Sequence, residues 1–98
     1  MKVKWSLPAQ ADLREFYESA LEQDPTYALN LAEALDVAIS QLLEFPRSGS
    51  PVGAAGHRKW RLKRAPFLMI YKIDENLLQI LRVYHERQDW GQDPGAPE

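Results

Sequence analysis

The first half of the chain places apolar residues with the period of an α-helix. In one segment they are three or four residues apart, at Leu13, Phe16, Tyr17, Ala20 and Leu21, which is the spacing of a single helical face. A longer segment keeps this spacing for about five turns, with apolar residues at Ala28, Leu31, Ala32, Leu35, Ile39, Leu42 and Leu43. The pattern therefore predicts two helices.

Local signals predict where these helices begin and end. Ser6 is suited to cap a helix, and Pro8 fits the first turn that follows. The pair Asp24-Pro25 ends one helix and starts the next, because proline disfavours helix at the residue before it and is favoured as a first helical residue. We expect the second helix to run from about Pro25 to Glu44 and Pro46 to end it. So short a link makes the two helices antiparallel.

The remaining pattern is typical of strands. Lys2–Trp5 alternates basic and apolar residues, as a short half-buried edge strand does. Turn signals at Ala65-Pro66 and Asp74-Glu75-Asn76 separate three later segments at hairpin distances. These segments are a basic strand, an almost wholly apolar strand and a third that ends in polar residues: Arg58–Arg64, Phe67–Ile73 and Leu77–Tyr84. Their spacing predicts an antiparallel meander.

Two other segments are expected to lack regular structure. Arg47–Gly56 is rich in Gly, Pro and Ser, and we expect it to be a mobile loop. The chain end carries Pro94, Gly95 and Pro97. We therefore expect a single domain at residues 1–90 and a disordered tail at residues 91–98.

The predicted order of elements is β-α-α-β-β-β, which is an α+β fold. The helical hairpin buries its apolar stripe by packing on one face of a small antiparallel sheet. The nearly continuous apolar run in Phe67–Ile73 indicates a strand covered on both faces. Since one hairpin covers one face, the second cover would come from a partner or another copy of the chain.

Composition narrows the class of protein. The chain of 98 residues is 45% hydrophobic and 27% charged, as in an ordinary globular domain. No segment approaches the roughly 18 uninterrupted apolar residues of a membrane span, and the N-terminal residues lack the apolar core of a secretory signal. We therefore expect a cytoplasmic protein. The absence of cysteine excludes disulfides and thiolate zinc sites, and we predict neither a metal nor a cofactor.

Charge is divided unevenly along the chain. Residues 1–56 carry four basic and eight acidic side chains, whereas residues 57–98 carry eight basic and six acidic ones. A basic second half can attract nucleic acid or an acidic protein. The net charge of −2, however, argues against a general binder of duplex DNA.

The order and spacing of several short pieces resemble the RelE/ParE superfamily of type II toxins, also called plasmid stabilisation proteins. The resemblance covers nearly the whole chain, although no single piece is specific. The pieces are the opening strand followed by Ala11-Asp12-Leu13, the hairpin ending in Phe45-Pro46-x-x-Gly49, Arg58 at the start of a strand, Phe67-x-x-x-Tyr71-x-Ile73, and Ile80-Leu81-Arg82-Val83-x-His85-x-x-Arg87-x-x-Trp90.

The resemblance implies a small toxin that arrests growth and is neutralised by an antitoxin encoded beside it, in a toxin–antitoxin hetero-oligomer. Members act either on DNA gyrase or as ribosome-dependent messenger RNA endonucleases. In the endonuclease branch an arginine usually lies within the strand that matches Phe67–Ile73, where this chain reads Phe67-Leu68-Met69-Ile70. We therefore favour the ParE-like branch, a gyrase inhibitor rather than an enzyme.

The resemblance and the charge pattern together give candidate site residues. For target binding they are Arg58, Arg61, Lys63, His85, Arg87 and Trp90. If the protein is instead an endonuclease acting on ribosome-bound messenger RNA, the catalytic candidates are Arg58, Arg61, His85 and Arg87. Several have a structural alternative: Arg58 can be a partly buried residue with a carboxylate or carbonyl partner, the other strand cations a solvated face, and His85 a cap at the sheet edge.

A further expectation concerns the antitoxin partner. Apolar surface on the helical hairpin or at a sheet edge would accept an amphipathic helix and an added strand from the antitoxin.

A third alternative for function is a non-toxic module that has kept only the antitoxin-binding fold. Induction without antitoxin separates this last alternative from the two toxins.

Overall fold

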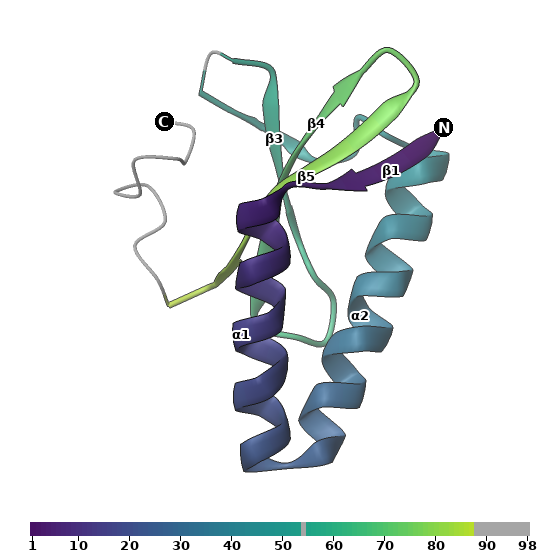
Figure 1. The fold of residues 1–98 in the computed structure, drawn as a ribbon. Coiled ribbons are helices and arrows are strands. Elements are labelled where there is room, and N and C mark those ends of the chain that lie inside the picture. The colour runs from purple at the N-terminus through teal and green to yellow at the C-terminus, as the bar shows by residue number, and fades with distance from the viewer. Residues whose placement is uncertain (54, 88–98) are drawn as a thin grey trace.

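A computed structural model describes residues 1–53 and 55–87. Along the chain the elements are β1 (Lys2–Trp5), α1 (Leu7–Gln23), α2 (Pro25–Glu44), β2 (Ser50–Val52), β3 (His57–Arg61), β4 (Phe67–Asp74) and β5 (Leu77–His85). The hairpin of α1 and α2 extends from one side of the strands (Figure 1). Trp90 and the predicted tail at residues 91–98 lie outside the described residues.

The predicted helix boundaries are confirmed, and the caps explain them. The hydroxyl of Ser6 accepts a hydrogen bond from the N–H of Ala9 at 3.1 Å. The same hydroxyl donates to the carbonyl of Leu81 at 2.7 Å, so the cap also ties α1 to β5. The carboxylate of Asp24 accepts from the N–H of Thr26 at 2.9 Å and starts α2. Each cap supplies a partner to one of the backbone N–H groups that a helix leaves unpaired at its first turn.

The five strands form one sheet in the order β1-β5-β4-β3-β2. The predicted α+β class and the helical hairpin on a small sheet are confirmed. The sheet is mixed rather than wholly antiparallel, because β1 pairs parallel to β5, with Val3 opposite Leu78 and Trp5 opposite Ile80. Alternation within the first strand shows its burial pattern but does not identify its partner, which lies at the far end of the sequence.

The strand β2 is an addition to the predicted fold. It lies within Arg47–Gly56, which the composition predicts to be a loop, and it pairs antiparallel with β3. Its last residue, Val52, is buried. Pro51 is compatible with this strand because β2 is at the edge of the sheet, where a missing N–H removes no bond to a further strand. Composition alone therefore predicts too long a loop, because Ser50–Val52 is a strand.

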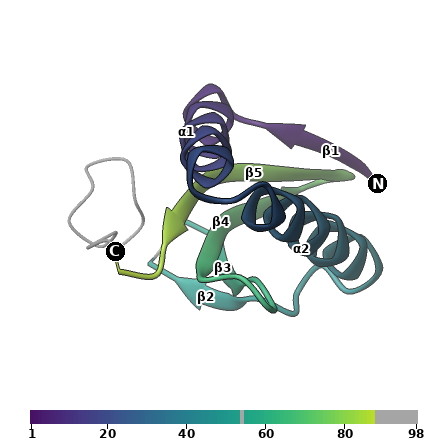
Figure 2. The ribbon, with the colours of Figure 1, turned by 90° about the horizontal axis from the view of Figure 1, so that it is seen from below.

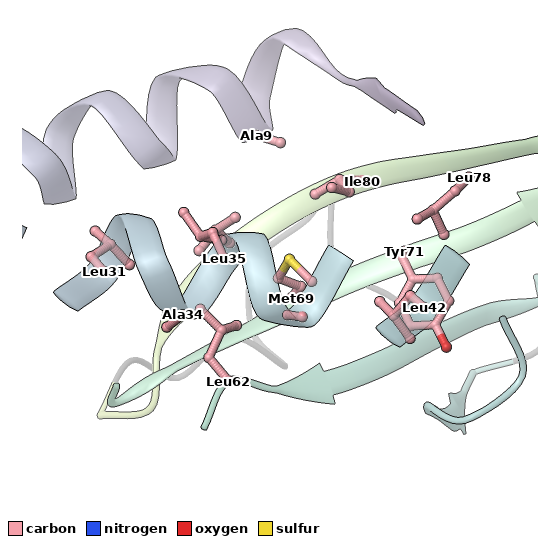
Figure 3. Close-up of a cluster of buried hydrophobic side chains, with 12 residues drawn as sticks. Ala9, Leu31, Ala34, Leu35, Leu42, Leu62, Met69, Tyr71, Leu78 and Ile80 are labelled. Atoms are coloured by element: carbon pink, nitrogen blue, oxygen red, sulfur yellow. The ribbon is translucent and has the colours of Figure 1, made fainter. Parts of the chain in front are cut away.

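The hydrophobic core lies between the hairpin and one face of the sheet, as Figure 3 shows. In Figure 2 the strands curve around α2, and α1 lies beside β5. Alanines of the helices are among the most buried residues and allow close packing. The core residues are Ala9, Leu31, Ala34, Leu35, Ala38 and Leu42 from the helices, and Leu62, Met69, Tyr71, Leu78, Ile80 and Val83 from the sheet and the residue after β3.

The middle strand β4 is buried on both sides. Met69 and Tyr71 point into the core under the helices. Between them, Ile70 is fully buried although it belongs to the opposite face. Tyr84 of β5, on that same opposite face, is 2% exposed. We call this second side, which carries Lys59, Arg61, Leu68, Ile70 and Tyr84, the far face of the sheet.

Candidate functional site

The side chains of the predicted basic strand lie in three different environments. The strand β3 ends at Arg61, so Lys63 lies in the connection to β4 and not on a strand face. Lys59 and Arg61 are both exposed and lie on the far face, as alternation predicts. Arg58, on the helix side, is only partly exposed. The predicted target-binding residues of β3 therefore do not form one surface.

Arg58 holds the segment that leads into β2. Its guanidinium donates hydrogen bonds to the carbonyl of Gly49 at 2.7 Å and to that of Arg47 at 3.2 Å. These are the carbonyl partners that a partly buried arginine requires. With its guanidinium committed to the backbone of this segment, Arg58 is a supporting residue in the described structure.

Tyr71 completes this support from the core. Its hydroxyl accepts from the N–H of Gly49 at 2.9 Å and donates to the carbonyl of Pro46 at 2.8 Å. Burial raises the pKa of the Tyr71 phenol above its ordinary value of 10.0. A Cβ at position 49 would collide with the Tyr71 hydroxyl and lie 2.7 Å from the carbonyl of Lys59. This close approach explains why Phe45-Pro46-x-x-Gly49 ends in glycine.

Arg61 lies beside an acidic residue from the end of the sheet. Its guanidinium donates two hydrogen bonds to Glu86, at 3.1 and 2.6 Å. The arginine side chain is 68% exposed and that of the glutamate 39%. An ion pair this exposed contributes little to stability, at most about 1 kcal/mol. Arg61 is thus accessible, with its charge oriented by Glu86.

The middle of the far face is apolar. Across it, Arg61 is followed by Leu68 and then Tyr84 on neighbouring strands. In the next row Ile70 separates Lys59 from Arg82. Ile70 is fully buried and Tyr84 is 2% exposed, so the cations of this face flank apolar residues of which only Leu68 is partly exposed.

Arg82 is engaged by α1. Its guanidinium forms two hydrogen bonds with the carboxylate of Asp12, at 2.7 and 3.0 Å. The same carboxylate accepts from the N–H of Val83 at 3.0 Å. The guanidinium also lies over the ring of Tyr84, 4.9 Å from its centroid. Asp12 thus holds Arg82 and supplies a partner to the edge of β5 beyond its pairing with β1.

His85 packs on an aromatic cluster and not beside Arg61. Its ring meets the ring of Phe67 edge-on at 5.2 Å, and Phe67 lies 4.9 Å from Phe16. The strand ends at His85, and the N–H of Arg87 donates to its Nδ1 at 3.1 Å. Because the chain turns at this point, strand alternation does not place His85 and Arg87 on one side. Trp90 lies outside the described residues.

A groove lies on the hairpin beside the edge strand β1. It has a volume of 880 Å³ and an apolar lining that includes Val3, Trp5, Leu13, Tyr17 and Leu35. Two cations, Lys4 and Arg14, also line it. The outer edge of β1 has no strand partner within the described residues. The predicted apolar surface on the hairpin is present, next to an edge that can accept a strand.

Charge is separated between the two layers of the molecule. The helical hairpin, residues 7–44, carries eight acidic side chains and one basic. The remaining described residues carry eleven basic and three acidic ones. Within the described part of the chain, no helix is long and apolar enough to cross a membrane, and no group of three metal-binding side chains is found.

Comparisons with known proteins agree with this geometry. The family "ParE toxin of type II toxin-antitoxin system, parDE" matches residues 3–90. A solved structure of the chromosomal ParDE TA system from P. aeruginosa is 27% identical, with a TM-score of 0.73 over 87% of this chain and 95% of that one. The E. coli RelBE complex shares 16% identity (TM-score 0.61; 88% and 96% covered) and isolated E. coli RelE 17% (0.60; 89% and 86%), which shows similarity of fold. No curated protein matches the sequence.

Proposed function

Because this chain belongs to the ParE toxin family of type II toxin–antitoxin systems, we propose that it inhibits DNA gyrase, arrests growth and is neutralised by an antitoxin. The far face of the sheet is the proposed target surface, with Arg61 as its accessible cation. The site of action is then the cytoplasm, where gyrase and DNA are.

One observation carries the choice of gyrase over RNA cleavage. Cleavage at a phosphodiester requires cations on the scissile phosphate and a proton-transfer group beside the attacking hydroxyl. On the far face the positions between the cations are Leu68 and Ile70, and Arg82 is paired with Asp12. Neither of these positions carries the cation or the proton-transfer group that cleavage requires, which favours a protein contact over a nuclease site.

A gyrase cleavage assay tests this function. Supercoiled plasmid, gyrase and purified toxin should accumulate linear DNA after detergent and protease treatment. Arg61→Ala is expected to reduce that accumulation, whereas Arg14→Ala, the same change on the helical hairpin, is expected to leave it intact. Absence of linear DNA at a large excess of wild-type toxin would count against gyrase as the target.

The endonuclease remains the second candidate because Arg61 and Glu86 place a cation and a carboxylate 2.6 Å apart at the end of the sheet. Induced cells separate the alternatives. A gyrase inhibitor produces filaments and a DNA damage response, whereas an endonuclease produces immediate translation arrest and messenger RNA cut in the ribosomal A site. Normal growth after strong induction without antitoxin would indicate a non-toxic binding module.

The groove beside β1 is the proposed antitoxin site. Its apolar lining suits an amphipathic helix, and the edge of β1 suits an added strand. Lys4 and Arg14 at this groove favour an acidic partner. Since the far face lies on the other side of the sheet, antitoxin and target would contact different residues.

Two arginine variants separate these surfaces. Arg14→Ala should weaken antitoxin binding in calorimetry and keep gyrase inhibition, and Arg61→Ala should do the reverse. Tyr17→Ala removes an aromatic ring from the groove and should weaken antitoxin binding further, while Leu21→Ala, one turn along α1, is the matched control. The product of the adjacent reading frame is the expected antitoxin. If it binds the Tyr17 and Arg14 variants as tightly as wild type, this groove is excluded as the antitoxin site.

A further inference from the structure

A second cavity opens at the far end of the helical hairpin, away from the groove beside β1. It has a volume of 430 Å³ and lies between the last turns of α1, the first turns of α2, the β3–β4 connection and the end of β5. This volume is within the range of roughly 300–1,000 Å³ that small-molecule sites occupy. Neither the proposed target surface nor the proposed antitoxin groove uses it.

Aromatic side chains form a large part of its lining. The ring of Phe67 contacts those of Phe16 and His85, with centroids 4.9 and 5.2 Å apart, and all three residues line the cavity. Tyr27 also lines the cavity and is 56% exposed. Such rings are contact surfaces for planar ligands, nucleobases above all, because every base has a π face.

The charge of the cavity favours an anion. Among the described residues no carboxylate lines it, although the hairpin that forms two of its walls carries eight acidic residues. Arg64 is the cation among these lining residues. The backbone of Arg64 has φ of 64°, in the left-handed region that residues with a Cβ seldom adopt. The turn therefore places a guanidinium at this cavity in spite of an unfavourable backbone conformation.

Two amide side chains complete the lining. Gln23 ends α1 and Asn30 lies in the second turn of α2, so the two amides come from facing helices. An amide side chain presents both a donor and an acceptor, and this combination pairs with the polar edge of a base. Aromatic rings recognise the face of a base, a guanidinium recognises a phosphate, and side-chain amides recognise the polar edge of a base.

We propose that this cavity binds a nucleotide. The base packs against the aromatic side chains with its edge towards Gln23 and Asn30, and the phosphate pairs with Arg64. The ligand is either a free mononucleotide or an unpaired nucleotide within a single strand, which share this chemistry. The inference concerns the isolated toxin and does not depend on gyrase as its target.

Nuclear magnetic resonance of the full-length protein tests the site. AMP, UMP, adenosine and a five-nucleotide single strand are titrated while the side-chain amide signals of Gln23 and Asn30 are followed. We expect saturable shifts with the nucleotides and weaker binding of adenosine, which lacks the phosphate. Binding of the strand more tightly than of AMP would assign the site to unpaired nucleic acid, and equal binding to free nucleotide.

Variants make the test specific. Arg64→Asn, which suits the left-handed backbone, should weaken binding roughly 10-fold through loss of one charge-assisted contact. Lys63→Asn removes the same charge one residue away and outside the lining, and should change affinity less than about twofold. Tyr27→Ala should weaken binding without changing the melting temperature. The proposal is overturned if no ligand shifts the two amides at about 10 mM, or if the Arg64 and Lys63 variants lose affinity equally.

Discussion

Removing the hydroxyl of Tyr71 is the sharpest perturbation of the segment that joins α2 to β2. In Tyr71→Phe the ring stays in the core, while the hydrogen bonds to Gly49 and Pro46, at 2.9 and 2.8 Å, are lost. Gly49 is buried, so its N–H is left without water as a replacement partner. Pro46 is partly exposed, and its carbonyl can recover a bond to solvent.

The expected loss follows from these two surroundings. A buried donor left unsatisfied costs about 1–3 kcal/mol, and a hydrogen bond exchanged for water about 0.5–1.5 kcal/mol. We therefore expect Tyr71→Phe to lower the free energy of unfolding by about 2–3 kcal/mol. At roughly 4–8 °C per kcal/mol for a domain of this size, the melting temperature should fall by about 8–24 °C.

Urea denaturation followed by circular dichroism measures this change, with Tyr17→Phe as the control. Tyr17 is 40% exposed on α1, and loss of its hydroxyl should stay within about 0.5 kcal/mol. A loss for Tyr71→Phe no larger than that of the control would refute the reasoning. A second check is Arg58→Met, because Arg58 and Tyr71 hold the same Gly49 backbone. Their effects should be coupled by more than about 0.5 kcal/mol, and strict additivity would contradict a shared role.

Three further changes test other parts of the structure. Gly49→Ala places a Cβ against the Tyr71 hydroxyl and the Lys59 carbonyl, so overpacking should lower the free energy of unfolding by about 1–3 kcal/mol; a neutral result in urea denaturation would contradict this. Asp12→Ala leaves Arg82 and the N–H of Val83 without their carboxylate. Because the side chains of Asp12 and Arg82 are both partly exposed, the free energy of unfolding should fall by about 2–3 kcal/mol, near the lower end for buried ion pairs. A fall of less than about 1 kcal/mol in urea denaturation would argue against this role of Asp12. Burial, and then the charge of Lys72, lower the pKa of His57 below 6.5. The unfolded chain therefore binds the proton more readily, and stability declines as pH falls through 6.5. In His57→Gln the urea midpoint should fall less between pH 7.5 and 5.5 than in wild type, and parallel pH profiles would exclude this contribution.

The helices were predictable because their signals are local. Ser6 and Asp24-Pro25 specify the starts of the two helices without reference to the rest of the chain. The edge strand β2 was missed because glycine, proline and serine are also typical of loops, and only the neighbouring β3 makes Ser50–Val52 a strand. The parallel partner of β1 is likewise set by packing and not by its own four residues.

The candidate site was less predictable for the same reason. A partly buried Arg58 is predicted to need a carboxylate or carbonyl partner, but the sequence does not show that this partner is the carbonyl of Gly49. His85 is a target-binding candidate in the sequence, but its contact with Phe67 follows from the pairing of β4 with β5, which the sequence does not show. The bulge that omits Leu81 from the pairing of β4 with β5 changes which side chains of β5 lie opposite those of β4, and strict alternation cannot anticipate it.

The pairing of β1 with β5 has a consequence for how the protein folds. The bond between Ser6 and Leu81 joins residues 75 positions apart, so the first strand has no place in the sheet until nearly all of the chain has been synthesised. Loop closure over such a distance slows folding relative to local contacts. The helical hairpin can form early, but its core against β4 and β5 is completed only at the end. Truncation before Leu77 would therefore remove the partner of β1 and release both ends of the fold together.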